Sequence, residues 1–245
     1  LRGAFARGKR SVPVHMVNLW AAGTRMALAQ RKAPNRNEVA GALELLALLD
    51  LDGAIVTADA LHCRPDIAQA IRRRKGDYVL ALKKNRGNLF KAAEALLTTT
   101  GKASRATQRP ARAHGRIEHR QAMVVQAKKL SQQHGFPDVV AVGRIESWRS
   151  TSDAKPKKSK VRFFLLSRKL AAKQLLEVGR AHWSIENNLH WVLDVLFAED
   201  ASRSRKDHAP ENLAVLRKLA INILQTTPGP QRMRHKLLHA RWNEA

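Results

Sequence analysis

Short apolar runs alternate with amphipathic segments along the first 98 residues of the chain. Val12 to Trp20 is rich in apolar and β-branched residues, and Thr24 to Gln30 follows it after a short break, which predicts an antiparallel hairpin. Further short apolar runs predict buried strands, and helical spacing predicts helices between them. The predicted strands are Ala54–Ala58 and Tyr78–Leu82, and the predicted helices are Asn37–Leu49, Arg64–Arg74 and Leu89–Leu97. Strands that alternate with helices favour an α/β sheet.

The pattern changes after residue 98. Basic and polar segments surround two strand-like stretches, Arg116–Val125 and Val139–Trp148, which predict a β-rich insertion. Beyond the insertion we expect a strand at Arg162–Ser167 and then helices, which run through Glu177, from Trp183 to Phe197 and from Pro210 to Leu224. We therefore divide the chain into a first core segment (1–98), the insertion (99–160), the last strand with the C-terminal helices (161–227) and a basic tail that frays (228–245).

The segment from His182 to Asp200 places one carboxylate inside an apolar helical pattern. Its apolar stripe consists of Ile185, Leu189, Val192 and Leu196. On a wheel of 100° per residue, His182, Glu186 and His190 form one row beside that stripe. Glu186 then lies on a rigid element at the rim of the core, which suits a metal-binding acid, although most helix glutamates are solvated or pair with a base. A zinc site made from this row is disfavoured, because zincin spacing is absent and no cysteine cluster supports it.

Composition points to a polyanionic partner. The chain has 245 residues and 44% hydrophobic content, enough for a core. It has 45 Lys and Arg against 20 Asp and Glu, a net charge of +25. Phosphate backbones fit best, because each cation that neutralises a phosphate releases condensed counterions. The lone Cys63 excludes an internal disulfide and a cysteine-based zinc site. No apolar stretch approaches a membrane span and no signal peptide opens the chain, so we expect a cytoplasmic protein.

A second acid, Asp59, directly follows the apolar run that ends at Ala58. Ligand sites in open α/β sheets lie outside the carboxyl ends of the strands, where this side chain is expected. A turn or helix N-cap role is the alternative for Asp59 taken by itself. Asp59 and Glu186 together could converge on hard divalent cations, which prefer carboxylate oxygens and promote phosphodiester displacement when two ions act as a pair.

Several sequence blocks occur in a consistent order over nearly the whole chain. They are Leu1–Gly3, Asn37–Glu38, Leu49–Cys63, Tyr78–Leu89, His114–Arg120, His182–Arg203 and Glu211–Leu224. In this order the blocks resemble the insertion-sequence transposases with an RNase H-like D-D-E core, in the branch related to the H-repeat-associated proteins. The resemblance implies an α/β fold, an RNase H-like mixed sheet flanked by helices, with a β-rich insertion before the last catalytic helix. It also implies a transposase that binds transposon-end DNA and catalyses metal-dependent cleavage and strand transfer when complete.

The resemblance implies that Asp59 is the second catalytic aspartate and Glu186 the catalytic glutamate, both ligands of two Mg²⁺ (or Mn²⁺) ions. In similar proteins the first aspartate lies in an Asp-Gly-Lys segment just upstream of the Leu-Arg-Gly block. Because this chain begins at Leu1 without a methionine, we expect an N-terminal truncation, a missing central strand and no strand transfer by this chain alone. The chain also departs from a related signature of Tyr, Arg, Glu and Lys, since Gly179, His182 and Leu193 stand at its other three positions.

Basic and aromatic side chains are the candidates for DNA contact. Those that follow the second predicted strand, near the expected crevice, are Lys83, Lys84 and Arg86. Those that end the second predicted helix are Arg72, Arg73 and Arg74, which form either a solvated helix end or a phosphate track. His182 and Trp148 complete the set, where Trp148 stacks on an unpaired base or lies in the core. We expect double-stranded DNA, transposon ends and target, as the partner of a homo-oligomer at the bacterial nucleoid.

Two other classes of protein share the basic composition. One is a non-catalytic DNA-binding relic or repurposed binder. Net charge cannot distinguish such a binder from a catalyst, but a substitution at Glu186 can. The other is a structural RNA-binding protein, which is disfavoured because it needs no acids at strand and helix ends.

Overall fold

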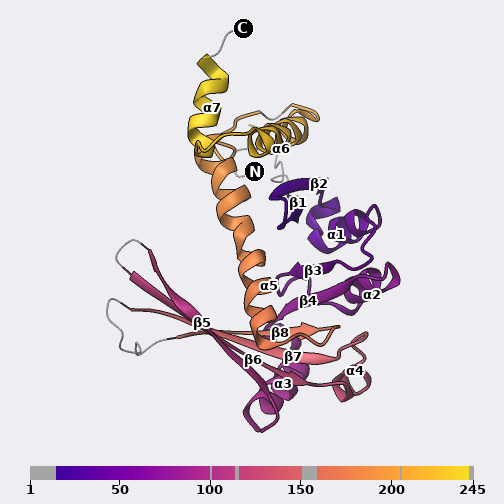
Figure 1. Cartoon of the computed structure of the whole chain (residues 1–245). Helices are drawn as coiled ribbons and strands as arrows, with labels where there is room; N and C mark the ends of the chain where they lie inside the picture. The colour runs from indigo at the N-terminus through magenta and orange to yellow at the C-terminus, as the bar shows by residue number, and fades with distance from the viewer. Residues whose placement is uncertain (1–14, 100, 114–115, 151–158, 205, 243–245) are drawn as a thin grey trace. The chain divides into compact units, whose positions relative to one another are not determined.

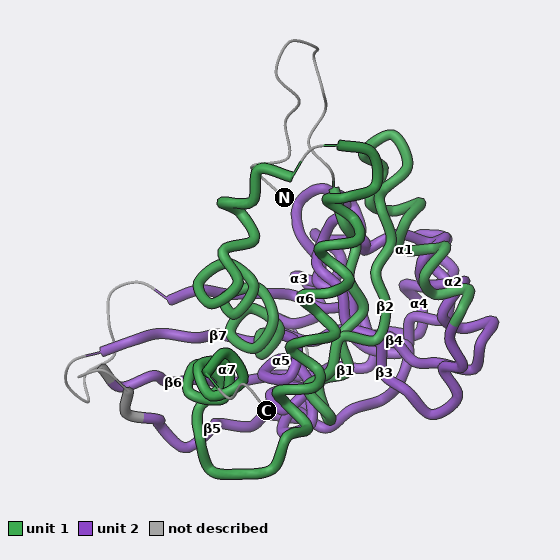
Figure 2. Tube along the Cα trace, turned by 90° about the horizontal axis from the view of Figure 1, so that it is seen from above, with its two compact units in different colours: residues 1–48, 183–245 green, residues 49–182 purple. Residues whose placement is uncertain are grey.

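The computed structural model describes residues 15–99, 101–113, 116–150, 159–204 and 206–242. The chain divides into two compact units, residues 1–48 with 183–245 (unit 1) and residues 49–182 (unit 2), coloured separately in Figure 2. Parts of several predictions lie outside the described residues, namely Leu1–Gly3, the start of the first strand at Val12, the pair His114 and Gly115, and most of the basic segment that ends at Lys160.

Unit 2 is built on a six-stranded mixed sheet with the strand order β3-β4-β8-β7-β6-β5. β3 and β4 are parallel, and every other neighbouring pair is antiparallel. The strands are β3 (Ile55–Ala58), β4 (Asp77–Leu82), β5 (Ser104–Ala113), β6 (Arg116–Gln126), β7 (Ala141–Ser150) and β8 (Lys160–Leu166). The helical elements are α2 (Pro65–Arg73), the 3-10 turn η2 (Lys84–Arg86), α3 (Gly87–Thr99), α4 (Lys129–His134) and α5 (Ala172–Ile185), whose last three residues belong to unit 1. The prediction of a mixed sheet flanked by helices is confirmed.

Two helices pack on opposite faces of this sheet. A Cβ atom at Gly143 of β7 would lie 2.5 Å from Leu175 Cδ2, and one at Gly179 of α5 would lie 2.7 Å from Ile145 Cδ1, so the two glycines allow α5 to approach the strand closely. On the other face, the ring of Phe90 in α3 meets that of Phe163 edge to face at 5.0 Å. We name these the α5 face and the α3 face.

The β-rich insertion is part of the main sheet. Its strands β5, β6 and β7 continue the sheet from β8, and Figure 1 shows them extending as a ribbon. β5 corrects the sequence analysis, which expected a basic, polar connection there. This strand has no apolar alternation and contains Pro110, but it lies at the edge of the sheet and its register shifts between Gln108 and Ala111. An edge position with a bulge is where a strand tolerates proline.

Unit 1 contains the predicted hairpin and the C-terminal helices. β1 (Met16–Ala21) and β2 (Met26–Lys32) pair in antiparallel fashion, which confirms the hairpin. The helical elements are η1 (Pro34–Arg36), α1 (Glu38–Leu46), the π-helical turns η3 (Glu186–His190) and η4 (Val192–Leu196), α6 (Ala209–Thr226) and α7 (Met233–Trp242). Asn222 of α6 joins β2 through two hydrogen bonds, because its amide oxygen accepts from Ala27 N (2.9 Å) and its Nδ2 donates to Ala27 O (2.8 Å). Among the described residues, no helix is both long enough and apolar enough to cross a membrane.

The helix expected from Trp183 to Phe197 is not a continuous α-helix. α5 ends at Ile185, and the next two turns are closed by backbone hydrogen bonds between residues five positions apart. Trp191 N donates to Glu186 O, and Phe197 N donates to Val192 O. A wheel of 100° per residue therefore does not apply beyond Ile185, because π-helical bonds widen the turn. A periodicity of 3.6 residues cannot reveal such a local change.

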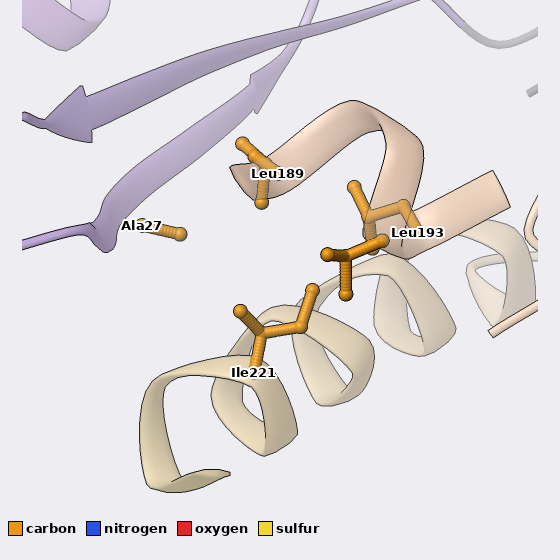
Figure 3. Close-up of a cluster of buried hydrophobic side chains, with 5 residues drawn as sticks. Ala27, Leu189, Leu193 and Ile221 are labelled. Atoms are coloured by element: carbon orange, nitrogen blue, oxygen red, sulfur yellow. The ribbon is translucent and has the colours of Figure 1, made fainter. Parts of the chain in front are cut away.

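The apolar stripe nevertheless forms the core of unit 1. Leu189, Val192 and Leu193 are buried together with Ala27 of β2 and Ile221 of α6 (Figure 3). The other two predicted members, at positions 185 and 196, are half-buried and pack against this cluster. The stripe therefore fixes which side of η3 and η4 faces the core.

We expect Leu189→Ala to lower the free energy of unfolding of unit 1 by about 2–5 kcal/mol, because Leu189 is fully buried and its removal leaves a cavity. Urea unfolding followed by tryptophan fluorescence measures this, since four of the five tryptophans belong to unit 1. Leu48→Ala is the matched control. Its side chain is 74% exposed, so a change within about 0.5 kcal/mol is expected, and equal losses in the two variants would contradict the core assignment.

Candidate functional site

Asp59 begins the loop that follows β3. Its Oδ1 accepts hydrogen bonds from the backbone N–H groups of Leu61 (3.1 Å) and His62 (3.4 Å), and it lies 2.9 Å from Nδ1 of the His62 ring. This arrangement is an Asx turn, so the turn role considered from the sequence is present, whereas the N-cap position of α2 is occupied by Arg64. All of these contacts use Oδ1, and the side chain is 64% exposed. The other oxygen, Oδ2, takes part in none of these three contacts.

The turn also controls the charge of Asp59. The hydrogen bond from His62 lowers the pKa of this carboxyl below its usual range, against the opposing effect of partial burial, and the charge of His62 and the two backbone bonds add to the lowering. His62 was not among the leading candidate site residues predicted from the sequence. The signal that could have found it is the spacing of three residues after an acid at a strand end, which is typical of a turn.

The loops after β3 and β4 are joined by side-chain hydrogen bonds. Asn85 Nδ2 donates to Ala60 O (2.9 Å), and Arg86 Nε donates to Cys63 O (3.0 Å). Because β3 and β4 are parallel, their carboxyl ends meet at one edge of the sheet, where ligands of open α/β sheets bind. The turn of Asp59 is therefore fixed from the neighbouring strand end.

His182 occupies the α5 face of the sheet. Its Nδ1 lies 3.0 Å from Oγ1 of Thr57, the third residue of β3. Asp59 lies two residues beyond Thr57, directly after the end of β3. The structure thus brings His182 to the strand that carries the candidate acid.

Glu186 lies in unit 1 as the first residue of the π-helical turn η3. Its side chain is 68% exposed, and Oε2 lies 3.5 Å from Nδ1 of His190. The buried Leu189 of the same turn holds this backbone against the core, so the carboxylate projects outward from an anchored segment. π-helical turns inside helices are frequently found at functional sites.

The candidate metal ligands are two individual acids, Asp59 and Glu186. In the part of the chain that the structure describes, no three His, Cys, Asp or Glu side chains gather closely enough to hold a metal ion. Asp59 and Glu186 each fit a hard cation as an exposed carboxylate donor, but neither has a preformed partner set among the described residues.

The predicted basic residues differ in how available they are. Lys83 and Lys84 are exposed at the carboxyl end of β4, beside the Asp59 loop. Arg73 is exposed and Arg74 is half-buried at the end of α2. Arg72 is committed to the fold, since its Nη1 contacts Asp77 Oδ1 (2.6 Å) and Gly76 O (2.7 Å), and its Nε contacts Asp138 Oδ2 (3.1 Å).

Trp148 lies on β7, directly opposite His119 of β6, and the two rings stack at 5.2 Å with an angle of 3° between their planes. Trp148 is half-buried, so it is neither a core residue nor a fully exposed platform. One of its ring faces is therefore covered by the imidazole of His119.

The parallel strand ends, the exposed Asp59 and the adjacent basic loop can now be set beside known protein families. Residues 2–223 match the sequence profile of a family described as "Transposase DDE domain". The chain belongs to this transposase family. The resemblance inferred from the sequence blocks is confirmed, and so is the RNase H-like fold class that it implied.

Individual proteins similar to this chain include ones that are named as transposases. The chain is 35% identical over 234 residues to "Putative transposase YncI" of Escherichia coli O157:H7, a match that covers 92% of this chain and 60% of the relative. It is 30% identical over 242 residues to "H repeat-associated putative transposase YhhI" of Escherichia coli K12, covering 91% and 61%. "Putative protein YbfL" of the same strain is 31% identical over 242 residues, with the same coverage. The transposase-domain chain spans about three fifths of the length of these relatives.

We expect His62→Leu to raise the pKa of Asp59 toward 3.8, because the substitution removes the largest cause of the lowering. Carboxyl ¹³C NMR of aspartate-labelled protein measures this pKa. Asp66 is the internal control, since its lowered pKa is caused by Arg64 and backbone bonds and should not change. An unchanged Asp59 pKa would show that the His62 contact does not form.

A stability difference follows from the same contact. A lowered folded-state pKa stabilises the fold above pH 3.8, and this contribution disappears as the pH falls through the folded-state value. Asp59→Asn should therefore be destabilising at pH 6 and nearly neutral when both proteins are compared below the folded-state pKa. Urea unfolding at the two pH values checks it, and a loss that is independent of pH would contradict it.

Proposed function

We propose that this chain is the catalytic-core portion of a DNA transposase and that Asp59 and Glu186 are two of its acidic metal ligands. The observation that carries the proposal is the position of Asp59, at the carboxyl end of β3 beside an exposed basic loop, in a chain of the transposase DDE domain family. Cutting and joining of transposon-end DNA is the activity we assign to the whole protein.

The two carboxylates have the chemistry that the role requires. Oδ2 of Asp59 and the carboxylate of Glu186 are hard oxygen donors, which Mg²⁺ and Mn²⁺ prefer. Asp59 is ionised at neutral pH, and the lowering of its pKa below 3.8 favours the charged form further. A pair of bound divalent ions supplies an activated water or hydroxyl nucleophile and stabilises the leaving oxygen of a phosphodiester. We propose two ions in the whole protein, with the remaining ligands outside the described residues.

Other residues would bind and orient the DNA. Lys83 and Lys84 would neutralise phosphates next to Asp59, since both are exposed at the end of the parallel strand pair. His182 would act from α5 on the same face of the sheet. Trp148, which is half-buried on β7, would stack on an unpaired base. Double-stranded DNA as partner, a homo-oligomer that joins two ends and a location at the bacterial nucleoid are parts of the same proposal.

Glu186→Gln and Asp59→Asn in the complete protein should each reduce transposition by at least about 100-fold, since each removes a charged metal ligand. Transposition frequency is measured in cells with a marked DNA segment that carries the gene and its native flanks. Fluorescence anisotropy with a duplex of the flanking sequence should show DNA affinity within about threefold of the unmodified protein.

Matched controls make the same chemical changes elsewhere. Glu177→Gln alters an exposed glutamate of α5, and Asp52→Asn alters an exposed aspartate before β3. Both should leave transposition unchanged. If the variants at Glu186 and Asp59 transpose as well as these controls, the catalytic assignment fails and a DNA binder without catalysis is the better account.

Lys83→Gln with Lys84→Gln should weaken binding of duplex DNA and lower the slope of log affinity against log salt by about 1.8, at 0.9 for each phosphate contact. Arg72→Gln serves as the contrast. It should lower stability, because Asp77 and Asp138 lose their ion pairs with Arg72, and leave the salt slope unchanged. Salt titrations and urea unfolding of the three proteins test this pair of expectations, and the reverse pattern would place the phosphate contacts at Arg72.

A further inference from the structure

A row of polar side chains crosses the ribbon of unit 2 on the α5 face. Residues directly opposite each other in antiparallel strands share a face. The register pairs Arg120 of β6 with Ser147 of β7, and Ser147 with Lys160 of β8. The next row toward the sheet centre pairs Ile145 with Arg162. Because Ile145 contacts α5 at Gly179, both rows belong to the α5 face.

This part of the face has an excess of positive charge. Among the residues that the structure describes, this face carries the cations Arg120, Arg149, Lys160 and Arg162 and the acid Glu118. Glu118 lies between two of them, with Oε2 3.0 Å from Arg120 Nη2 and Oε1 3.6 Å from Arg149 Nη2. Of these two cations, Arg149 is the exposed one (67%), whereas Arg120 is 15% exposed.

Arg162 shows the effect of this excess. The pKa of its guanidinium is lowered by burial and further by the positive charge of Arg120. Like charges held close on a rigid sheet are unfavourable unless an anion lies between them. The arrangement is therefore one that a bound phosphate would stabilise.

The strand register connects the cations to the candidate acid. Leu82 of β4 pairs with Phe163 of β8, and the next residue, Lys83, remains extended (φ −130°, ψ 177°). The register therefore places Lys83 opposite Arg162, and Asp59 directly follows the adjoining strand β3, which ends at Ala58. Neighbouring strands lie about 4.8 Å apart, so steps of about 5–10 Å separate Lys83, Arg162 and the outer row.

We infer that Lys83, Arg162, Lys160, Arg120 and Arg149 form a continuous track on the α5 face of unit 2 that binds the phosphate backbone of duplex DNA and leads it to Asp59. The inference rests on the proposed function, because it assigns the DNA path of that same site. Cations spaced over several strands fit successive phosphates of one nucleic-acid backbone better than a single small anion. The track lies wholly within unit 2 and uses ribbon residues that the sequence did not mark for DNA contact.

The test uses the double variant Lys160→Gln with Arg149→Gln in the full chain. Both side chains are exposed, so the fold should tolerate the changes. The matched control is Arg105→Gln with Lys129→Gln, which removes two exposed charges of unit 2 away from the track. Arg105 lies opposite Met123, in register with the α3 face, and Lys129 lies on α4. Binding of a fluorescein-labelled 30-base-pair duplex is followed by anisotropy between 50 and 300 mM salt.

We expect the track variant to bind about tenfold more weakly at 100 mM salt, with a salt slope lower by about 1.8, while the control keeps the slope of the unmodified chain. Equal losses in the track and control variants would overturn the track, because they would show a general effect of net charge. Binding identical to that of the unmodified chain would overturn it too. If the unmodified chain shows no salt-dependent binding, the proposed function and the track both fail. If the unmodified chain does bind with salt dependence, the two outcomes above overturn the track alone.

Discussion

The parallel pairing of β3 with β4 is the constraint on which the candidate site depends. It brings two strand ends, two loops and their side chains to one edge of the sheet. Asn85 and Arg86 then bond to the carbonyls of Ala60 and Cys63, so the loop that begins at Asp59 is fixed by the next strand along the sheet. Without that pairing, Asp59 would be an exposed turn residue with no defined neighbours.

The packing of α5 gives this edge a definite face. Gly143 and Gly179 leave no room for a Cβ atom, and the helix therefore lies close against β7. Its far end brings His182 to Thr57 of β3. The same face continues outward to the cations of the ribbon, so one sheet surface carries both the acid and the side chains that we assign to phosphate. The β-rich segment is thus an extension of the main sheet, and we assign the surface for the DNA to it.

The sequence predicted the elements whose stability is local or whose burial is complete. β3 and β4 are short apolar runs, and α1 is preceded by its N-cap Asn37, whose side chain accepts a hydrogen bond from Ala40 N. β5 could not be predicted, because a basic strand with a proline exists only through pairing with β6. The π-helical turn at Glu186 also could not be predicted, since it changes the backbone hydrogen bonding without changing the apolar pattern.

The candidate site was predictable in part for the same reason. Asp59 and Glu186 stand out in sequence because each carboxylate interrupts an apolar pattern, whereas the ion pairs that commit Arg72 to the fold depend on Asp77 and Asp138, the latter far away in the chain. His62 acquires its importance only through the turn geometry at Asp59.

The most direct measurement is the anomalous scattering of Mn²⁺ in crystals of the complete protein bound to DNA. The account predicts manganese within about 2.5 Å of a carboxylate oxygen of Asp59 and of Glu186, next to a DNA phosphate. Manganese held elsewhere, with both carboxylates free of metal in a DNA-bound complex, would contradict it.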